Sequence, residues 1–175
     1  MVGAAYAHCY AGRHSEGLLK VRLVHEFEVT PPDDSGALVG LRMSGKLDGY
    51  VRSEANGSAC LRSADAAVYP ACGGGPVLSL AFPPCCAPPG GAGRCQQEFE
   101  LPPQTLPAGR YVLVADLTPE ASVDGTCRGH AEAVFAPGPR VGTWYPLPNA
   151  MSQLDGKGFG LAITLKVQPL PFRAE

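Results

Sequence analysis

Glycine and proline interrupt this chain so often that long helices have little room to form. Of the 175 residues, 22 are glycine and 18 are proline, and both types break helices and favour turns. Between the turns, short segments alternate apolar and polar residues, as strands with one buried face do. About eight such segments are present, without an internal repeat. Turn signals at this spacing predict an all-β fold, a two-sheet antiparallel β-sandwich.

The clearest strands are predicted at residues 20–29, 97–101, 110–117 and 159–167. Both faces of 110–117 are apolar, so this strand is expected at the centre of a sheet. His25 lies on the apolar face of the first strand. We interpret it as a hydrogen-bonded core or rim histidine, because that role is commoner than a catalytic one.

Two hairpins are also predicted. Residues 38–51 read as two strands around Ser44-Gly45-Lys46, and Asp124-Gly125 is a strong hairpin signal before a strand at 127–135. In that last strand, alternation predicts that Ala131 and Ala133 point inward and Glu132 outward.

Charge and hydropathy exclude several classes of protein. The net charge of −2 provides no broad basic field for nucleic acid. With 45% hydrophobic and 17% charged residues, wholesale disorder is not expected. The apolar runs are far shorter than the roughly 18 residues that span a bilayer, so no transmembrane segment is predicted.

Seven cysteines are many for a reducing compartment, and they lack the paired C-x-x-C spacing of zinc sites. A disulfide framework in an oxidising compartment is the better interpretation. Asn56-Gly57-Ser58 is a glycosylation sequon, which fits a secretory route. Residues 1–10 have neither the basic start nor the apolar centre of a signal peptide. We therefore expect an extracellular or organelle-lumen location, without a leader in this numbering.

The cysteine spacing constrains the disulfides only in part. Cys85 and Cys86 are adjacent, and a bond between neighbours is strained, so they are expected to pair with two different partners. Cys95 is one natural partner. The odd number of cysteines leaves one thiol free or in an intermolecular bond.

The sequence carries no catalytic motif. It has no Gly-x-Ser-x-Gly, His-Glu-x-x-His, P-loop or dinucleotide-binding fingerprint. Asp116, Glu120 and Asp124 are interpreted as a solvated acidic loop around a turn. Cys86 or Cys95 as a nucleophile would need a nearby histidine, which the sequence does not place. We predict a protein that is not an enzyme and that has no cofactor.

A metal site is also not predicted. His8 and His14 lie near Cys9, but no fourth ligand has matching spacing. An exposed loop with one disulfide cysteine is the preferred interpretation of this segment.

The order of cysteines and turns over roughly residues 9–135 suggests a family. Cys9 precedes the first strong strand; Pro84-Cys85-Cys86-Ala87-Pro88, Phe99-Glu100-Leu101-Pro102, Gly109-Arg110-Tyr111-Val112 and Gly125-Thr126-Cys127 follow in order. In this the chain resembles the ML lipid-recognition domains, most closely the ganglioside-activator branch. It departs from them by continuing past the expected end with the strand at 159–167, and by lacking a signal peptide.

The resemblance implies two antiparallel sheets splayed into a cup that holds an acyl chain, with no catalytic group. It implies a Cys9–Cys127 disulfide and a Cys60–Cys72 pair near the mouth of the cup; Cys86 and Cys95 complete the disulfide candidates. We expect a sandwich domain at 1–135 and, at 136–175, a Pro-rich arm plus an additional strand on the same domain. The candidate cavity residues are the apolar ones expected to point inward: Val21, Leu23, Phe27, Phe82, Phe99, Leu101, Tyr111 and Leu113.

A second hypothesis is a structural accessory subunit of a larger protein assembly. The Pro-rich arm contains the only tryptophan, so Trp144, Tyr145 and Pro146 are the candidate docking residues, together with the termini. The two hypotheses are compatible, because one fold can serve as a lipid carrier or as a scaffold.

Overall fold

The computed structural model describes residues 3–9, 14–31, 38–54, 56–124, 129–135 and 160–168. These residues form strands and turns and no helix, which confirms the all-β prediction. They contain more strands than the eight expected, because several short strands lie at the sheet edges. The strands are β1 (Gly3–Cys9), β2 (Ser15–Leu18), β3 (Val21–Val29), β4 (Leu38–Ser53), β5 (Gly57–Pro70), β6 (Leu78–Phe82), β7 (Cys85–Cys86), β8 (Ala92–Glu100), β9 (Gln104–Pro107), β10 (Gly109–Val123), β11 (Gly129–Phe135) and β12 (Gly160–Gln168).

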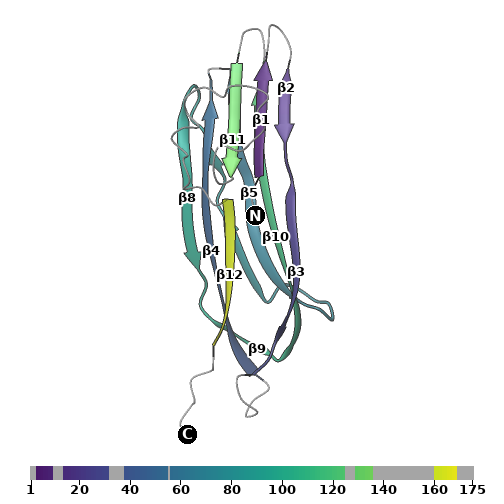
Figure 1. Ribbon diagram of the computed structural model, residues 1–175. Helices are drawn as coiled ribbons and strands as arrows, with labels where there is room; N and C mark the ends of the chain where they lie inside the picture. Colours follow the sequence, from purple (N-terminus) through teal and green to yellow (C-terminus); the bar gives the residue numbers. More distant parts are fainter. Residues whose placement is uncertain are drawn as a thin grey trace.

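The strands make two antiparallel sheets, as expected for a sandwich (Figure 1). In the first sheet β4 is central: β8 and β9 pair with one side of it, β11 and β12 pair with the other, and β1 pairs with β11. In the second sheet β2 and β3 pair with one side of β10, β5 pairs with the other side, and β6 and β7 pair with β5. The molecule is elongated along the strands, because β4, β5 and β10 each run nearly its full length.

The prediction that 110–117 is a central strand is confirmed. This segment lies within β10, which has paired strands on both sides. Its side chains alternate strictly, with Tyr111, Leu113, Ala115 and Leu117 buried. They meet the inward residues of β4, such as Leu41 and Met43, in one continuous hydrophobic core.

The hairpin predicted at 38–51 is wrong. The segment is one continuous strand, β4, and Gly45 and Gly49 lie within it. A Cβ atom at Gly45 would lie 2.4 Å from Leu80 Cδ2, and one at Gly49 would lie 2.1 Å from Phe135 Cδ1. These glycines make room for neighbouring side chains, which is a second use of glycine in a strand besides turning the chain.

The hairpin predicted at Asp124-Gly125 is also wrong. β10 belongs to the second sheet, whereas β11 belongs to the first and pairs with β1 and β4. The chain therefore crosses between the sheets here. Glu132 lies on the outer side of β11, as alternation predicts, but the residue is only 1% exposed.

β11 and β12 lie end to end along the same side of β4. Val134 of β11 is opposite Tyr50, and Gly160 of β12 is opposite Asp48. Residues 136–159 thus connect two pieces that follow one another along β4. The predicted strand at 159–167 is present as β12.

Two disulfides join strands at one edge. Cys60 in β5 bonds to Cys86, and Cys85 bonds to Cys95 in β8. The adjacent cysteines therefore have different partners, as predicted, and Cys95 is one of those partners. The Cys60–Cys72 pair is wrong, because Cys72 is a free, exposed cysteine in the turn after β5.

The Cys9–Cys127 pair stays a prediction, because Cys127 lies outside the described residues. The two disulfides present are compatible with an oxidising compartment.

Candidate functional site

One long side of the molecule is bordered by β12 in the first sheet and by β3 in the second (Figure 1). β1 contacts both β2 and β10, which places the β11–β12 side of the first sheet over the β2–β3 side of the second. β1 extends the first sheet only beside β11. Among the described strands, none pairs with the outer side of β12, so no strand of the first sheet lies over β3.

The inward face of β3 is consequently exposed in the middle of the strand, at Leu23 and His25, although Val29 at its end is buried. In the register with β10, Leu23 lies opposite Ala115 and Phe27 opposite Tyr111. Ala115 is fully buried, but Leu23 is 43% exposed although it points to the same side of the sheet. Phe27 is half-buried and stacks on Tyr111 with a ring separation of 6.0 Å.

His25 is on this same inward face and is exposed. Its ring stacks on Phe27 at 6.5 Å. A core position for His25 is thus wrong, since the face on which it lies is not covered there; the rim position that the interpretation also allowed agrees with an exposed residue on the apolar face.

On the inward face of β12, the exposed fraction of the side chains increases from the start of the strand to its end. Leu161 is buried, Ile163 and Leu165 are half-buried, and Val167 is 50% exposed. The β4 residues opposite these four are all buried, so the increase in exposure is confined to β12 and does not extend to β4. We call this surface the open edge; it consists of Leu23, His25 and Phe27 from β3 and Ile163, Leu165 and Val167 from β12.

The eight candidate cavity residues fall into two groups. Val21, Leu23, Phe27, Tyr111 and Leu113 lie at or beneath the open edge. Phe82, Phe99 and Leu101 lie at the opposite edge, where the rings of Phe82 and Phe99 are 5.3 Å apart. Phe99 points inward from an edge strand but is 42% exposed. The structure therefore does not bring all eight into one cavity.

Three residues of the open edge, Ile163, Leu165 and Val167, are not among the cavity residues that the sequence predicts. Their alternation was visible, but the sequence did not show which strand β12 pairs with or what faces it. The candidate docking residues Trp144, Tyr145 and Pro146 lie outside the described residues.

A second feature is a polar groove of about 390 Å³ on the outer face of the second sheet. It lies where both neighbours of β10 are irregular: pairing with β5 shifts register between Thr118 and Pro119, and β3 gives way to β2. Pro119 cannot donate a ladder hydrogen bond, which fits this interruption. The lining residues are Leu18, Lys20, Arg22, Arg62, Ser63, Asp65, Asp116 and Thr118.

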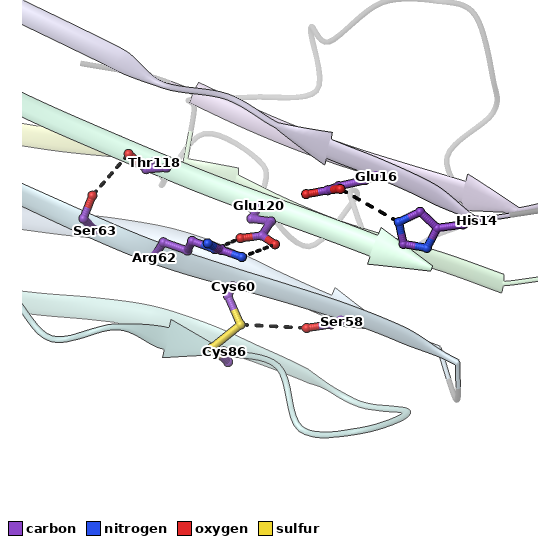
Figure 2. A network of polar contacts seen from close by, with 9 residues as sticks. All are labelled: His14, Glu16, Ser58, Cys60, Arg62, Ser63, Cys86, Thr118 and Glu120. Atoms are coloured by element: carbon purple, nitrogen blue, oxygen red, sulfur yellow. Dashed lines mark hydrogen bonds and ion pairs between the residues drawn. A yellow bond between two sulfur atoms is a disulfide. The ribbon is translucent and has the colours of Figure 1, made fainter. Parts of the chain in front are cut away.

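Two acidic residues of this region, Asp116 and Glu120, are paired with arginines. Arg22 donates two hydrogen bonds to Asp116, at 2.7 and 2.8 Å. Arg62 forms an ion pair with Glu120, which Figure 2 shows. Ser63 donates to Thr118 at 3.2 Å. Burial, and then the charge of Asp116, raise the pKa of Asp65.

The solvated acidic loop predicted from Asp116, Glu120 and Asp124 is wrong for Asp116 and Glu120, whereas Asp124 follows β10 and its side chain is 91% exposed. Asp116 and Glu120 lie on β10 and face arginines from neighbouring strands. Asp124 bonds to His14, and this hydrogen bond raises the pKa of the imidazole. We assign Asp116 and Glu120 a structural role in the sheet.

The remaining chemical candidates are also accounted for. Cys86 and Cys95 are oxidised in disulfides, so neither presents a thiolate nucleophile. Within the described ranges, no three histidine, cysteine or acidic residues cluster as metal ligands. The described residues also include no helix long and apolar enough to cross a membrane.

Comparison with protein-family models finds no match for this chain, and comparisons with curated proteins and with solved structures find none either.

Proposed function

We propose that this chain is a non-enzymatic binding module that holds an acyl chain, or a similar apolar ligand, between its two sheets. The observation that carries the proposal is the open edge. Side chains such as Leu23 and Val167 point toward the interior of the sandwich and yet are about half exposed. Exposed apolar surface that is continuous with a core is characteristic of ligand-binding grooves.

The composition of the open edge favours the apolar part of a ligand. Of its six residues, only His25 is ionisable, and Phe27 and Leu165 pack against the core. A flexible chain lying along the strands would cover these side chains and would gain about 25 cal/mol per Å² of apolar surface removed from water. A polar headgroup on such a ligand would remain in solvent, outside the open edge.

The proposed location is the secretory pathway, extracellular space or an organelle lumen. Two disulfides support it, and Asn56 of the glycosylation sequon is exposed in the turn between β4 and β5. The accessory-subunit alternative stays a prediction, because its docking residues lie outside the described ranges.

The test compares two neighbouring residues on opposite faces of β3. Leu23→Asp places a charge on the inward face, whereas Val24→Asp places one on the outer face at a residue that is 58% exposed. Binding of a fluorescent fatty acid to the purified full chain is measured, with native mass spectrometry to detect a co-purified lipid. We expect Leu23→Asp to weaken binding by about tenfold or more, and Val24→Asp to leave it within about twofold.

Both variants are checked by circular dichroism for retained folding. Equal loss of binding in the two folded variants, or no saturable binding by the unaltered chain, would reject the open edge as a ligand site.

A further inference from the structure

The outer face of β3 carries charges segregated by sign. From the residue just before the strand, the outward residues are Lys20, Arg22, Val24, Glu26 and Glu28. Two cations thus precede Val24 along the chain and two anions follow it, at the same sequence separations from Val24. All five are exposed.

β3 is also an edge strand. It pairs with β10 through one side, and none of the described strands pairs with its other side. Within the described residues Lys20, Glu26 and Glu28 form no ion pair. Arg22 uses Nε and one terminal nitrogen for Asp116, which leaves its other terminal nitrogen as a donor. A long edge with unpaired backbone groups is a template for another strand.

We propose that this edge binds a second copy of the chain, with the two β3 strands antiparallel about a two-fold axis at Val24. Lys20 then lies opposite Glu28 of the second copy, Arg22 opposite Glu26, and Val24 opposite Val24. By symmetry each of the two ion pairs occurs twice, whereas the Val24 pair lies on the axis and occurs once. Opposite charges directly across antiparallel strands stabilise the pairing, and a two-fold interface uses the same surface on both subunits.

The register is selected by the charges. Moving the axis to Leu23 places Arg22 opposite Val24, and moving it to His25 places Val24 opposite Glu26. Either shift leaves only one of the two cations opposite an anion. Charged residues on edge strands usually discourage pairing; here their arrangement disfavours every symmetric register except one.

The inward face fits the same register. Val21 lies opposite Phe27 of the second copy, and Leu23 lies opposite His25. Pairing therefore also covers part of Leu23, which is otherwise exposed. The second sheet would continue through both copies as one sheet.

The first experiment measures the mass of the full chain by sedimentation equilibrium at low and high salt. We expect a dimer that weakens as salt rises, because exposed ion pairs are screened. Glu26→Lys with Glu28→Lys gives this outer face, from residue 20 to residue 28, four cations, and Lys20→Glu with Arg22→Glu gives it four anions. Each variant alone is expected to dimerise about tenfold or more weakly, and an equimolar mixture is expected to recover the association.

A second experiment keeps the charges largely intact, in case the anionic variant folds poorly after losing the Arg22–Asp116 pair. In a Cys72→Ser background, Val24→Cys should form an intermolecular disulfide under mild oxidation. Paired Cα atoms across antiparallel strands lie about 4.5–5.5 Å apart, within disulfide reach. Glu26→Cys is the control, since the two copies of that residue would be about 13 Å apart.

The proposal is rejected if the unaltered chain is monomeric at all concentrations tested. It is also rejected if a dimer persists in the four-cation variant while Val24→Cys fails to cross-link, because the copies would then meet through another surface. The charge variants alter only the outer face of β3, so either result leaves the open-edge proposal to be judged by its own test.

Discussion

At the scale of single residues, two glycines in β4 determine how closely the molecule packs. Gly45 lies under Leu80 of the opposite sheet, and Gly49 lies against the ring of Phe135, which belongs to the neighbouring strand β11. Phe135 and Leu80 are both buried, so neither can move into solvent to admit a new side chain.

Gly49→Ala is therefore expected to destabilise the fold by about 1–3 kcal/mol, although alanine is otherwise the better strand residue. Gly75→Ala is the matched control, because a Cβ atom there meets no atom within 4 Å. The free energy of unfolding in urea distinguishes them. Equal stability of the two variants would contradict the close contact with Phe135.

Ion pairs on the outer face of the first sheet differ in burial. Arg94 donates two hydrogen bonds to Asp48, at 2.9 and 2.7 Å, and the Asp48 side chain is only 4% exposed. Lys46 pairs with Glu98 between the same two strands, with both side chains exposed.

Arg94→Met should leave the buried Asp48 carboxylate without its partner and cost about 1–3 kcal/mol of stability. Lys46→Met should change stability by less than about 0.5 kcal/mol, since exposed pairs contribute little. Urea unfolding of both variants provides the comparison, and a larger loss in Lys46→Met would contradict this ranking.

At the scale of elements, the short strand β7 links the two sheets. Its Cys86 bonds to β5 within the second sheet, and its Cys85 bonds to β8 in the first. The disulfides therefore hold one edge of the sandwich together, on the side opposite the open edge.

The double variant Cys85→Ala, Cys95→Ala is expected to lose about 3 kcal/mol, because the bond closes a short loop in the unfolded chain. Cys72→Ser, at the free and exposed cysteine, should change stability by less than about 0.5 kcal/mol. Unfolding without reductant measures both. A peptide map of the unreduced chain that links Cys60 to Cys72 would contradict the connectivity.

Alternation in the sequence located strands well but not their partners. The apolar faces of 110–117 and 159–167 predict strands; the first lies within β10, and residues 160–167 of the second lie within β12. The hairpin at Gly45 was wrong because a glycine that avoids a clash and a glycine that turns the chain look alike in a sequence. The hairpin at Asp124-Gly125 was wrong because a turn signal does not say in which sheet the next strand lies.

At the scale of the whole molecule, the two long sides of the sandwich are unlike. The side at β7 and β8 is joined by a disulfide and exposes one inward-facing residue, Phe99, whereas the side at β3 and β12 exposes several, Leu23, His25 and Val167 among them. Stability should therefore be distributed unevenly, since regions with fewer buried contacts open more readily.

Hydrogen exchange should show the slowest amides in the central strands β4, β5 and β10, and faster exchange in β3. A bound acyl ligand should slow exchange in β3 and β12 but not in β8. Exchange measured by mass spectrometry, with and without a fatty acid, tests this. Slowing confined to β8 would instead assign the ligand to the Phe82–Phe99 edge.

The sequence by itself determined the fold class, the central position of 110–117 and the separate partners of Cys85 and Cys86. These follow from local physics: side-chain alternation, helix-breaking residues and the strain of a bond between adjacent cysteines. Only the tertiary structure decided which strands pair, that Cys60 bonds to Cys86, and that Leu23 and His25 are exposed although Tyr111 and Leu113 are buried. Each of these depends on which distant strand lies opposite, and alternation within one strand is the same whether or not a second sheet covers it.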